Sequence, residues 1–302
     1  MPRLALAVVL FLFLAVTARA ADAPKLPAIK PDVIEKIKAA LPEKPFAAPK
    51  QARKILVYSR TAGFRHGSIA IGANSMALLG EKTGAFTIVH SEDPTMFDAD
   101  NLKQFDAILM LNTTGDCLST GKGEDKDKLE QRKKNFSDFV TSGKGLAGMH
   151  SATDTLYSWP QYGEMIGAWF QSHPWGKAAT KIDSPNHPLT QMFDAEKGFD
   201  VSDEIYMFGP KTAGKIQPYS REKLRVLLSL HAQKMDVKGG AREDKDYAIS
   251  WIRTYEKGRV FYCALGHSDQ MYYHPVVLKH YLAGLQYVLG DLEADATPSV
   301  KK

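Results

Sequence analysis

The chain has 302 residues, and 39 Lys and Arg against 34 Asp and Glu give it a net charge of +5. The basic residues are interspersed, without a basic run or interleaved aromatic residues, so the charge predicts no nucleic-acid partner. Only Cys117 and Cys263 occur, which excludes a disulfide framework and a CxxC metal site. A single bridge between the two stays open, because it is allowed outside the cytoplasm.

The first 20 residues have the pattern of a secretory signal peptide. An apolar stretch runs from Leu4 to Val16, which is short of the roughly 20 residues that span a bilayer. Ala18 and Ala20 fit the small-residue rule for cleavage. We therefore expect removal of residues 1–20, a secreted or periplasmic mature protein, and no stable membrane insertion after cleavage. The alternative is an uncleaved amphitropic anchor.

Composition divides the rest of the chain into three parts. Residues 21–53 are rich in Pro, Lys and Ala, which indicates an extended lead-in with one short helix at 32–40. Residues 54–292 have the length of one large α/β domain. Residues 293–302 are expected to form a disordered tail.

Apolar runs and amphipathic stretches alternate in the first half of the domain. The pattern predicts strands at residues 54–59, 86–90, 105–111 and 145–149, and helices at 68–83 and 123–142. Further strands are predicted at 178–182, 204–208, 226–231, 247–253 and 259–264, and a closing helix at 275–289. This order predicts an α/β fold with a mostly parallel, doubly wound sheet flanked by helices, and an antiparallel hairpin around Gly258.

Histidines follow several of the predicted strands. Ligands of open parallel sheets bind at the carboxyl ends of the strands, so these positions are examined first. Neutral imidazole is the commonest metal ligand, and His150, His173 and His267 with Glu204 would make a site for a divalent ion such as Zn²⁺, Mn²⁺ or Ni²⁺. No compact H-E-x-x-H motif supports the site. The alternative is that each histidine only bonds to a loop backbone.

Other catalytic and cofactor motifs are missing. Ser151 lacks the G-x-S-x-G elbow of a hydrolase serine, and neither cysteine occupies a strand-to-helix turn after a glycine. Gly63 and Gly67 match neither G-x-G-x-x-G nor a phosphate-binding loop, so no nucleotide cofactor is expected.

Two groups of residues are candidates for substrate binding. Arg65 and His66 precede a predicted helix, where they can hold an anion or sugar hydroxyls, or else serve only in capping and contact with solvent. Trp159 and Tyr162 follow the fourth strand. Their rings can stack on sugar faces, or they pack a helix against the sheet.

Six ordered motifs bring these residues together: TAGFRHGSI at 61–69, GMHSATD at 148–154, WPQY at 159–162, IGAWFQSHP at 166–174, DEIY at 203–206 and GRVFYCALGH at 258–267. Together they resemble the ThuA-like family, named for trehalose utilisation. The resemblance implies a class I glutamine amidotransferase-like fold and a sugar-related role. Where the amidotransferases present a nucleophilic Cys after the fourth strand, this chain has His150, so a thioester mechanism is not available to it.

The sequence therefore favours an exported enzyme acting on a sugar, whether trehalose, another disaccharide or a keto-sugar, in a His-rich cleft with or without a metal. His150, Asp154 and His267 are the expected catalytic residues. The alternative is a non-catalytic periplasmic protein that binds or senses carbohydrate. An exported amidase or peptidase would need a nucleophile that the sequence does not offer.

Overall fold

The computed structural model describes residues 26–209, 211–212, 215–235 and 242–300, so the predicted signal peptide lies outside the described residues. The main sheet consists of β1 (Lys54–Tyr58), β2 (Thr87–Ser91), β3 (Ala107–Leu111), β4 (Gly145–Met149), β5 (Ser172–Ile182), β6 (Phe199–Met207), β9 (Arg225–Leu230), β10 (Ala248–Tyr255) and β11 (Gly258–Cys263). The helices are α1 (Pro31–Ala40), α2 (Ile69–Thr83), α3 (Ala99–Leu102), α4 (Lys126–Thr141), α5 (Pro160–Ile166) and α6 (Pro275–Val288). Short elements are η1 (Pro94–Phe97), η2 (His150–Thr153), η3 (Pro188–Thr190), η4 (Asp269–Tyr273) and the pair β7 (Lys211–Thr212) and β8 (Lys215–Ile216).

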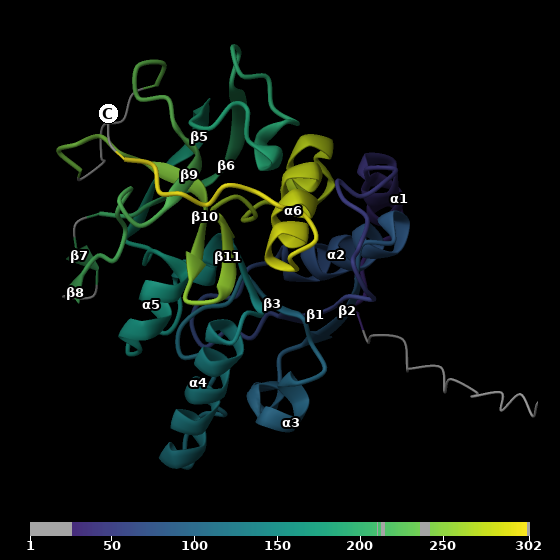
Figure 1. The fold of residues 1–302 in the computed structure, drawn as a ribbon, viewed down its shortest axis with the longest axis vertical. Helices are drawn as coiled ribbons and strands as arrows, with labels where there is room; N and C mark the ends of the chain where they lie inside the picture. Colours follow the sequence, from purple (N-terminus) through teal and green to yellow (C-terminus); the bar gives the residue numbers. More distant parts are fainter. Residues whose placement is uncertain (1–25, 210, 213–214, 236–241, 301–302) are drawn as a thin grey trace, which may run out of the picture.

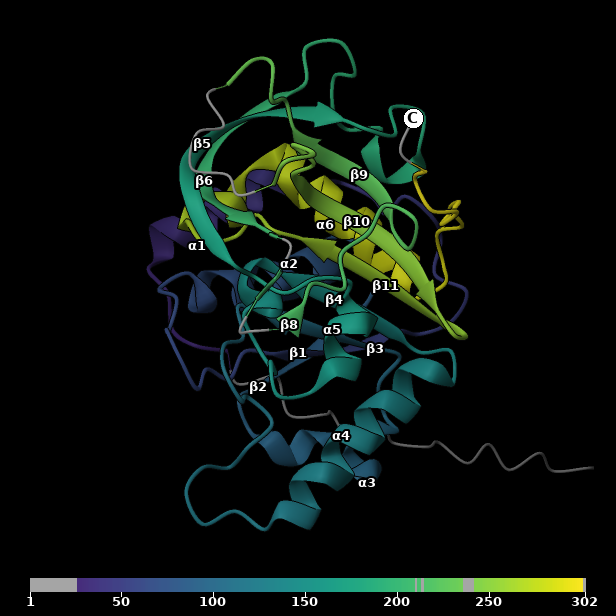
Figure 2. The same ribbon diagram turned by 90° about the vertical axis from the view of Figure 1, so that its left-hand side faces the viewer.

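The sheet has the strand order β2-β1-β3-β4-β11-β10-β9-β5-β6. Neighbours from β2 to β11 are parallel, and neighbours from β11 to β6 are antiparallel. The predicted α/β class, parallel core and late hairpin are confirmed. The antiparallel part is larger than predicted, because β9, β5 and β6 continue it beyond the hairpin and arch over one end of the molecule (Figure 2).

The central strands are covered on both faces, which explains their continuous apolar sequences. Every residue of β3 and β4 is buried. A Cβ added to Gly145 would meet the α6 backbone at Val288, 2.5 Å away, and one added to Gly148 would meet the Ile166 side chain of α5, 2.8 Å away. These glycines therefore allow close approach of α6 on one face and α5 on the other, and Figure 1 shows the helices on either side of the sheet.

The outer strands are longer than the sequence pattern predicts. β5 begins at Ser172 instead of residue 178, and β6 begins at Phe199 instead of residue 204. β6 lies at the edge of the sheet, where exposed polar residues such as Asp200 and Ser202 hide the strand pattern.

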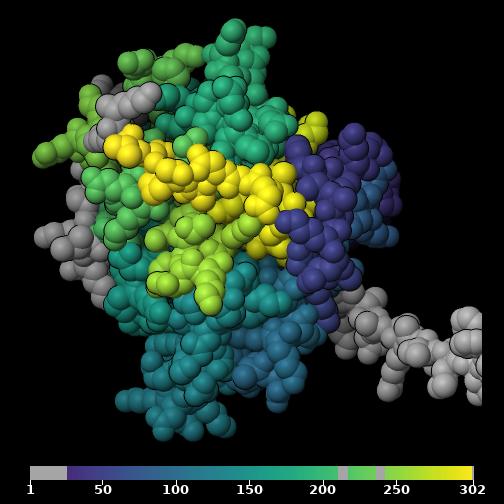
Figure 3. Space-filling model, viewed as in Figure 1, coloured from purple at the N-terminus to yellow at the C-terminus, as the bar shows by residue number. Residues whose placement is uncertain are grey.

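The lead-in and the carboxyl-terminal segment pack side by side (Figure 3). The Phe46 amide donates to Oε1 of Gln286 at 2.7 Å, and Arg53 pairs with the buried carboxylate of Asp291 at 2.6 Å. The expected disorder of the tail is wrong for residues 293–300, because Ser299 donates to the Leu224 carbonyl and accepts from the Val226 amide.

Cys117 and Cys263 are buried free thiols, so the disulfide bridge left open by the sequence is not formed.

Among the described residues, no helix is long and apolar enough to cross a membrane.

Candidate metal centre

Four side chains from distant parts of the chain converge at the carboxyl ends of β4 and β11. His66 lies in the loop before α2, His150 directly follows β4, His267 follows β11, and Glu204 lies in β6. One ligand atom from each lies within 4.8 Å of all the others. The ends of parallel neighbours β4 and β11 meet at one sheet edge, which is why residues so far apart in sequence come together.

His150 is fixed in both backbone and tautomer. Its φ of +47° is in the left-handed region that non-glycine residues rarely adopt, at the tight turn from β4 into η2. Its side chain is completely buried, and Nδ1 lies 2.9 Å from the Ala264 carbonyl. Because a carbonyl can only accept, Nδ1 carries the hydrogen, and Nε2 of the neutral ring presents a lone pair to the cluster.

The atoms that face one another in the cluster are rich in electrons. Nε2 of His150 lies 3.1 Å from Nε2 of His66 and 3.4 Å from Oε2 of Glu204. Nδ1 of His267 lies 3.3 Å from the same Oε2 but is buried without a hydrogen bond. A hydrogen on Nε2 of His66 can fill its contact with His150, but the contacts of Glu204 with His150 and His267 need a proton or a cation between the atoms. A tetrahedral ion with bonds of 2.0–2.1 Å holds its ligands about 3.3 Å apart, so the spacing fits a bound metal.

The protonation states also suit a metal site. Burial lowers the pKa of His66 to about 3, with a further contribution from His150 and His267, so His66 is neutral near pH 7. Burial by itself would raise the pKa of Glu204, but the contacts with His150, His267 and His173 outweigh it and leave the pKa below its usual value. A neutral imidazole and an ionised carboxylate are the forms that coordinate metals.

A second carboxylate of β6 holds the loop that carries His267. The buried Asp203 accepts from the amides of Gly266 at 2.7 Å, His267 at 3.3 Å and Ser268 at 2.8 Å. Gly266 has a φ of +130°, and a Cβ there would lie 2.6 Å from the hydroxyl of Tyr272. Two neighbouring residues of β6 thus have different roles. Glu204 supplies a carboxylate to the cluster, and Asp203 binds the backbone that positions His267.

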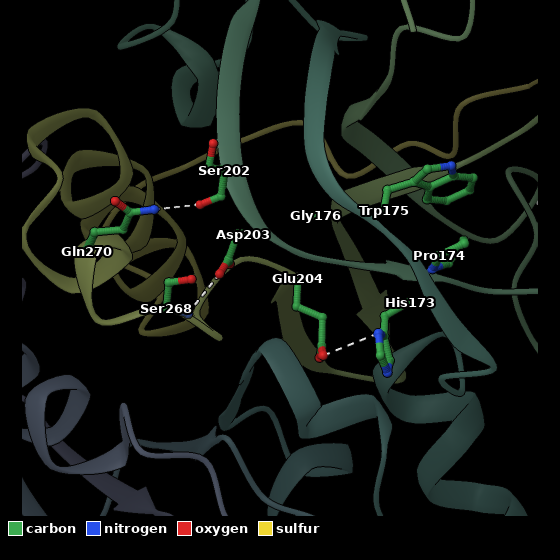
Figure 4. A pocket seen from close by; sticks show the side chains of 9 residues that line it. All are labelled: His173, Pro174, Trp175, Gly176, Ser202, Asp203, Glu204, Ser268 and Gln270. Carbon is green, nitrogen blue, oxygen red and sulfur yellow. Dashed lines mark hydrogen bonds and ion pairs between the residues drawn. The ribbon is translucent and has the colours of Figure 1, made fainter. Parts of the chain in front are cut away.

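A polar pocket of about 420 Å³ opens beside Glu204 (Figure 4). It is lined by His173, Pro174, Trp175, Gly176, Ser202, Asp203, Glu204, Ser268 and Gln270. This volume is in the range of small-molecule sites, roughly 300–1,000 Å³. The pocket therefore gives a ligand access to the carboxylate of the cluster.

A larger hollow of about 960 Å³ includes Asp183, Arg221 and Asp246. Arg221 pairs with Asp183 at 3.0 Å and with Asp246 at 2.8 Å. These charges already satisfy one another, so the cluster beside Glu204 is the stronger candidate site.

The structure brings together three of the four residues predicted to bind metal: His150, Glu204 and His267. His173 lies outside the group. Its Nδ1 is 3.3 Å from Oε1 of Glu204, and its side chain is 54% exposed at the pocket. His66, predicted to bind substrate, takes the fourth place. Its position after the first strand, at the same sheet edge as His150, is the one signal that would have suggested this role.

The other predicted residues lie in different surroundings. Arg65 forms a two-bond ion pair with Glu92 at 2.8 and 3.0 Å. Trp159 and Tyr162 are buried, not displayed in a cleft, because they pack together and against Phe136 in the core. The interpretation of these two rings as substrate-binding is therefore wrong, and the packing alternative holds.

Asp154 is half-buried near the cluster. Its Oδ1 accepts from the hydroxyl of Tyr157 at 2.7 Å. Burial raises the pKa of Asp154 above its usual value, although the Tyr157 bond and the neighbouring His150 oppose the shift.

The helix-flanked α/β sheet thus carries an imidazole, that of His150, in the constrained turn after β4. The family model for ThuA, described as trehalose utilisation, matches residues 54–288. The chain belongs to the ThuA family.

Solved structures agree on the fold. A protein described as ThuA-like from Bacteroides uniformis has 20% identity and a TM-score of 0.59, covering 80% of this chain and 94% of that one. A similarly described protein from Parabacteroides merdae has 14% identity and a TM-score of 0.54, with 83% and 94% covered. The cytoplasmic protein STM1381 from Salmonella typhimurium has 13% identity and a TM-score of 0.50, with 78% and 99% covered. No curated protein matches the sequence.

Proposed function

We propose that this protein is an exported, metal-dependent enzyme acting on a sugar such as trehalose, another disaccharide or a keto-sugar. The observation that carries the proposal is the convergence of His66, His150, His267 and Glu204, in which the buried Nδ1 of His267 has no hydrogen bond. Membership of a family described as trehalose utilisation supports a sugar substrate. The signal peptide predicted at residues 1–20 supports a periplasmic or secreted location.

The donor set narrows the chemistry of the ion. Three imidazoles and one carboxylate suit Zn²⁺, Mn²⁺ or Ni²⁺, and a bound ion would polarise a sugar carbonyl or hydroxyl pair and acidify a bound water. Four protein ligands would leave a tetrahedral ion no open position. Catalysis therefore requires either a five- or six-coordinate ion, or a Glu204 that stays outside the ligand shell and accepts a proton.

Asp154 is the proposed proton carrier beside the centre. Its raised pKa lets the carboxyl exchange a proton nearer neutral pH than an ordinary aspartate does. The bond from Tyr157 orients the carboxyl. His150 and His267 were the other expected catalytic residues, and in this proposal they act as ligands.

The test starts from purified protein stripped of metal. Calorimetric titration with Zn²⁺, Mn²⁺ and Ni²⁺ should give one tight, stoichiometric site, and turnover of trehalose or its oxidised derivative should depend on the ion. Equal, weak binding by wild type and His150→Ala would end the metal hypothesis. Sugar binding without turnover by the loaded protein would instead favour a carbohydrate-binding or sensing protein.

A further inference from the structure

Phe64 is an exposed aromatic residue at the edge of the candidate metal centre. Among the described residues, only Phe64 and Val300 are large, apolar and well exposed, and Phe64 is 65% exposed. A single exposed apolar side chain is ordinary on a protein surface. Its location beside the cluster is what gives it significance.

The ring of Phe64 contacts one of the cluster's imidazoles. The ring centroids of Phe64 and His66 are 4.9 Å apart, with the rings at 77°. The His66 ring is in turn 4.7 Å from that of His150 and 5.2 Å from that of His267. A molecule lying on Phe64 is therefore one imidazole away from the donor atoms of the cluster.

The backbone around Phe64 is held in place by Thr114, which follows β3. The Ala62 amide donates to the Thr114 carbonyl at 2.8 Å, and the Gly63 amide donates to Oγ1 of Thr114 at 3.2 Å. The same hydroxyl donates to the Phe64 carbonyl at 2.8 Å. On the other side of Phe64, Arg65 forms an ion pair with Glu92. The loop thus presents the ring to solvent in a fixed position, which lowers the entropy cost of binding.

We propose that Phe64 is a substrate-binding residue whose ring packs against the apolar face of a sugar ring. The hydroxyls on the edge of that sugar then lie beside His66, the imidazole of the cluster that Phe64 contacts. A pyranose suits this position because it combines a C–H face, which packs on aromatic rings, with polar edges that suit metal ligands. The inference rests on the proposed function and names the class of its substrate.

A second copy of the chain is a less suitable partner for Phe64 than a sugar is. A stable interface needs about 800 Å² from each partner and a core of several apolar residues. Among the described residues only Phe64 and Val300 are large, apolar and well exposed, which is too few for such a core. One isolated ring beside a donor cluster fits a small amphipathic ligand better than a protein surface.

The experiment measures binding of four probes, trehalose, maltose, sucrose and D-glucose, to the metal-loaded protein by calorimetry. For the probe that binds best, Phe64→Ala should weaken binding about fivefold, as expected for an aromatic contact worth about 1 kcal/mol. Phe64→Trp, which keeps a ring, should stay within about threefold of wild type. Val300→Ala is the matched control for an exposed apolar side chain and should bind like wild type.

The outcomes separate this inference from the proposed function. Metal content measured on every variant should not change. Unchanged sugar binding by Phe64→Ala, or no binding of any probe by the metal-loaded wild type, would overturn the role of Phe64. Loss of metal by Phe64→Ala would also overturn the substrate-binding role, and would show that Phe64 supports the position of His66 instead. A dimer that Phe64→Ala converts to monomer would show a protein interface instead. Failure of the wild type to bind metal would count against the proposed function alone.

Discussion

His280 and two of the clustered histidines, His66 and His150, are buried, and His267 is partly exposed, but the surroundings of His280 and of the cluster differ. In α6, Nδ1 of His280 lies 2.8 Å from the Leu189 carbonyl, and Nε2 lies 2.8 Å from the hydroxyl of Ser250. Both nitrogens therefore have a partner. In the cluster, by contrast, Nδ1 of His267 is buried and has no hydrogen bond.

The comparison shows how one residue type serves stability in one place and binding in another. Buried polar atoms are normally paired, and an unpaired group costs free energy that the rest of the fold must offset. Hydrogen-bond partners on both ring nitrogens, as in His280, are expected of a core histidine. The unpaired Nδ1 of His267 at the carboxyl ends of the strands is expected of a site that a ligand completes.

The largest expected effect comes from removing a cluster ligand. His150→Ala should lower the affinity for the preferred ion by at least about 100-fold, because even partners of metal ligands commonly account for 10–100-fold. Added metal should raise the melting temperature of wild type but not of this variant. Adding His267→Ala should change the affinity little further, since the site is already broken. Additive losses would mean that the two residues bind independently.

His280→Ala should show the opposite behaviour. Losing a fully buried ring and leaving the Leu189 carbonyl unpaired should cost about 2–3 kcal/mol in the free energy of unfolding. Metal affinity should stay as in wild type. Urea unfolding and metal titration of the same preparation measure both quantities, and a loss of metal binding would remove the distinction between the two regions.

Asp203→Asn tests whether the supporting carboxylate acts on the centre. The amide side chain keeps one acceptor but loses the charge that holds three backbone amides, so the loop carrying His267 should be less well placed. We expect metal affinity to fall about tenfold, at the lower end for a group that supports ligands. Asp200→Asn, at an exposed position of the same strand, is the control and should bind metal normally. Equal affinity in both variants would assign Asp203 a purely structural role.

The sequence predicts the parallel core and the meeting of His150 and His267 for the same reason. Short, fully apolar runs define β3 and β4, and the ends of parallel neighbours must share an edge. The position of His173 was harder to predict, because exposed polar residues interrupt the strand pattern in the first half of β5. In the structure the side chain of His173 lines the pocket.

The aromatic residues show a second limit of sequence patterns. Phe64 and Tyr162 are both aromatic residues within the motifs at 61–69 and 159–162, and composition does not say which one faces solvent. In the structure the hydroxyl of Tyr162 donates to the Ala152 carbonyl inside the core, while Phe64 is exposed in a loop held by Thr114. That difference arises from tertiary packing, which the local pattern does not encode.

The smallest expected effect is a pH dependence of stability that originates at His280. Burial lowers its pKa to about 4, whereas the residue titrates near 6.5 when unfolded. Between these values the unfolded chain binds the extra proton, so stability should fall as the pH drops below about 6.5 and level off below about 4. From pH 7 to pH 5.5 this histidine should account for a loss of about 1 kcal/mol in the free energy of unfolding.

His280→Gln removes the titration while retaining a polar side chain, and His66 still titrates in both proteins. Urea unfolding of metal-free protein at the two pH values should therefore show a smaller loss in the variant, and equal losses would mean that His280 is not neutral and buried as described.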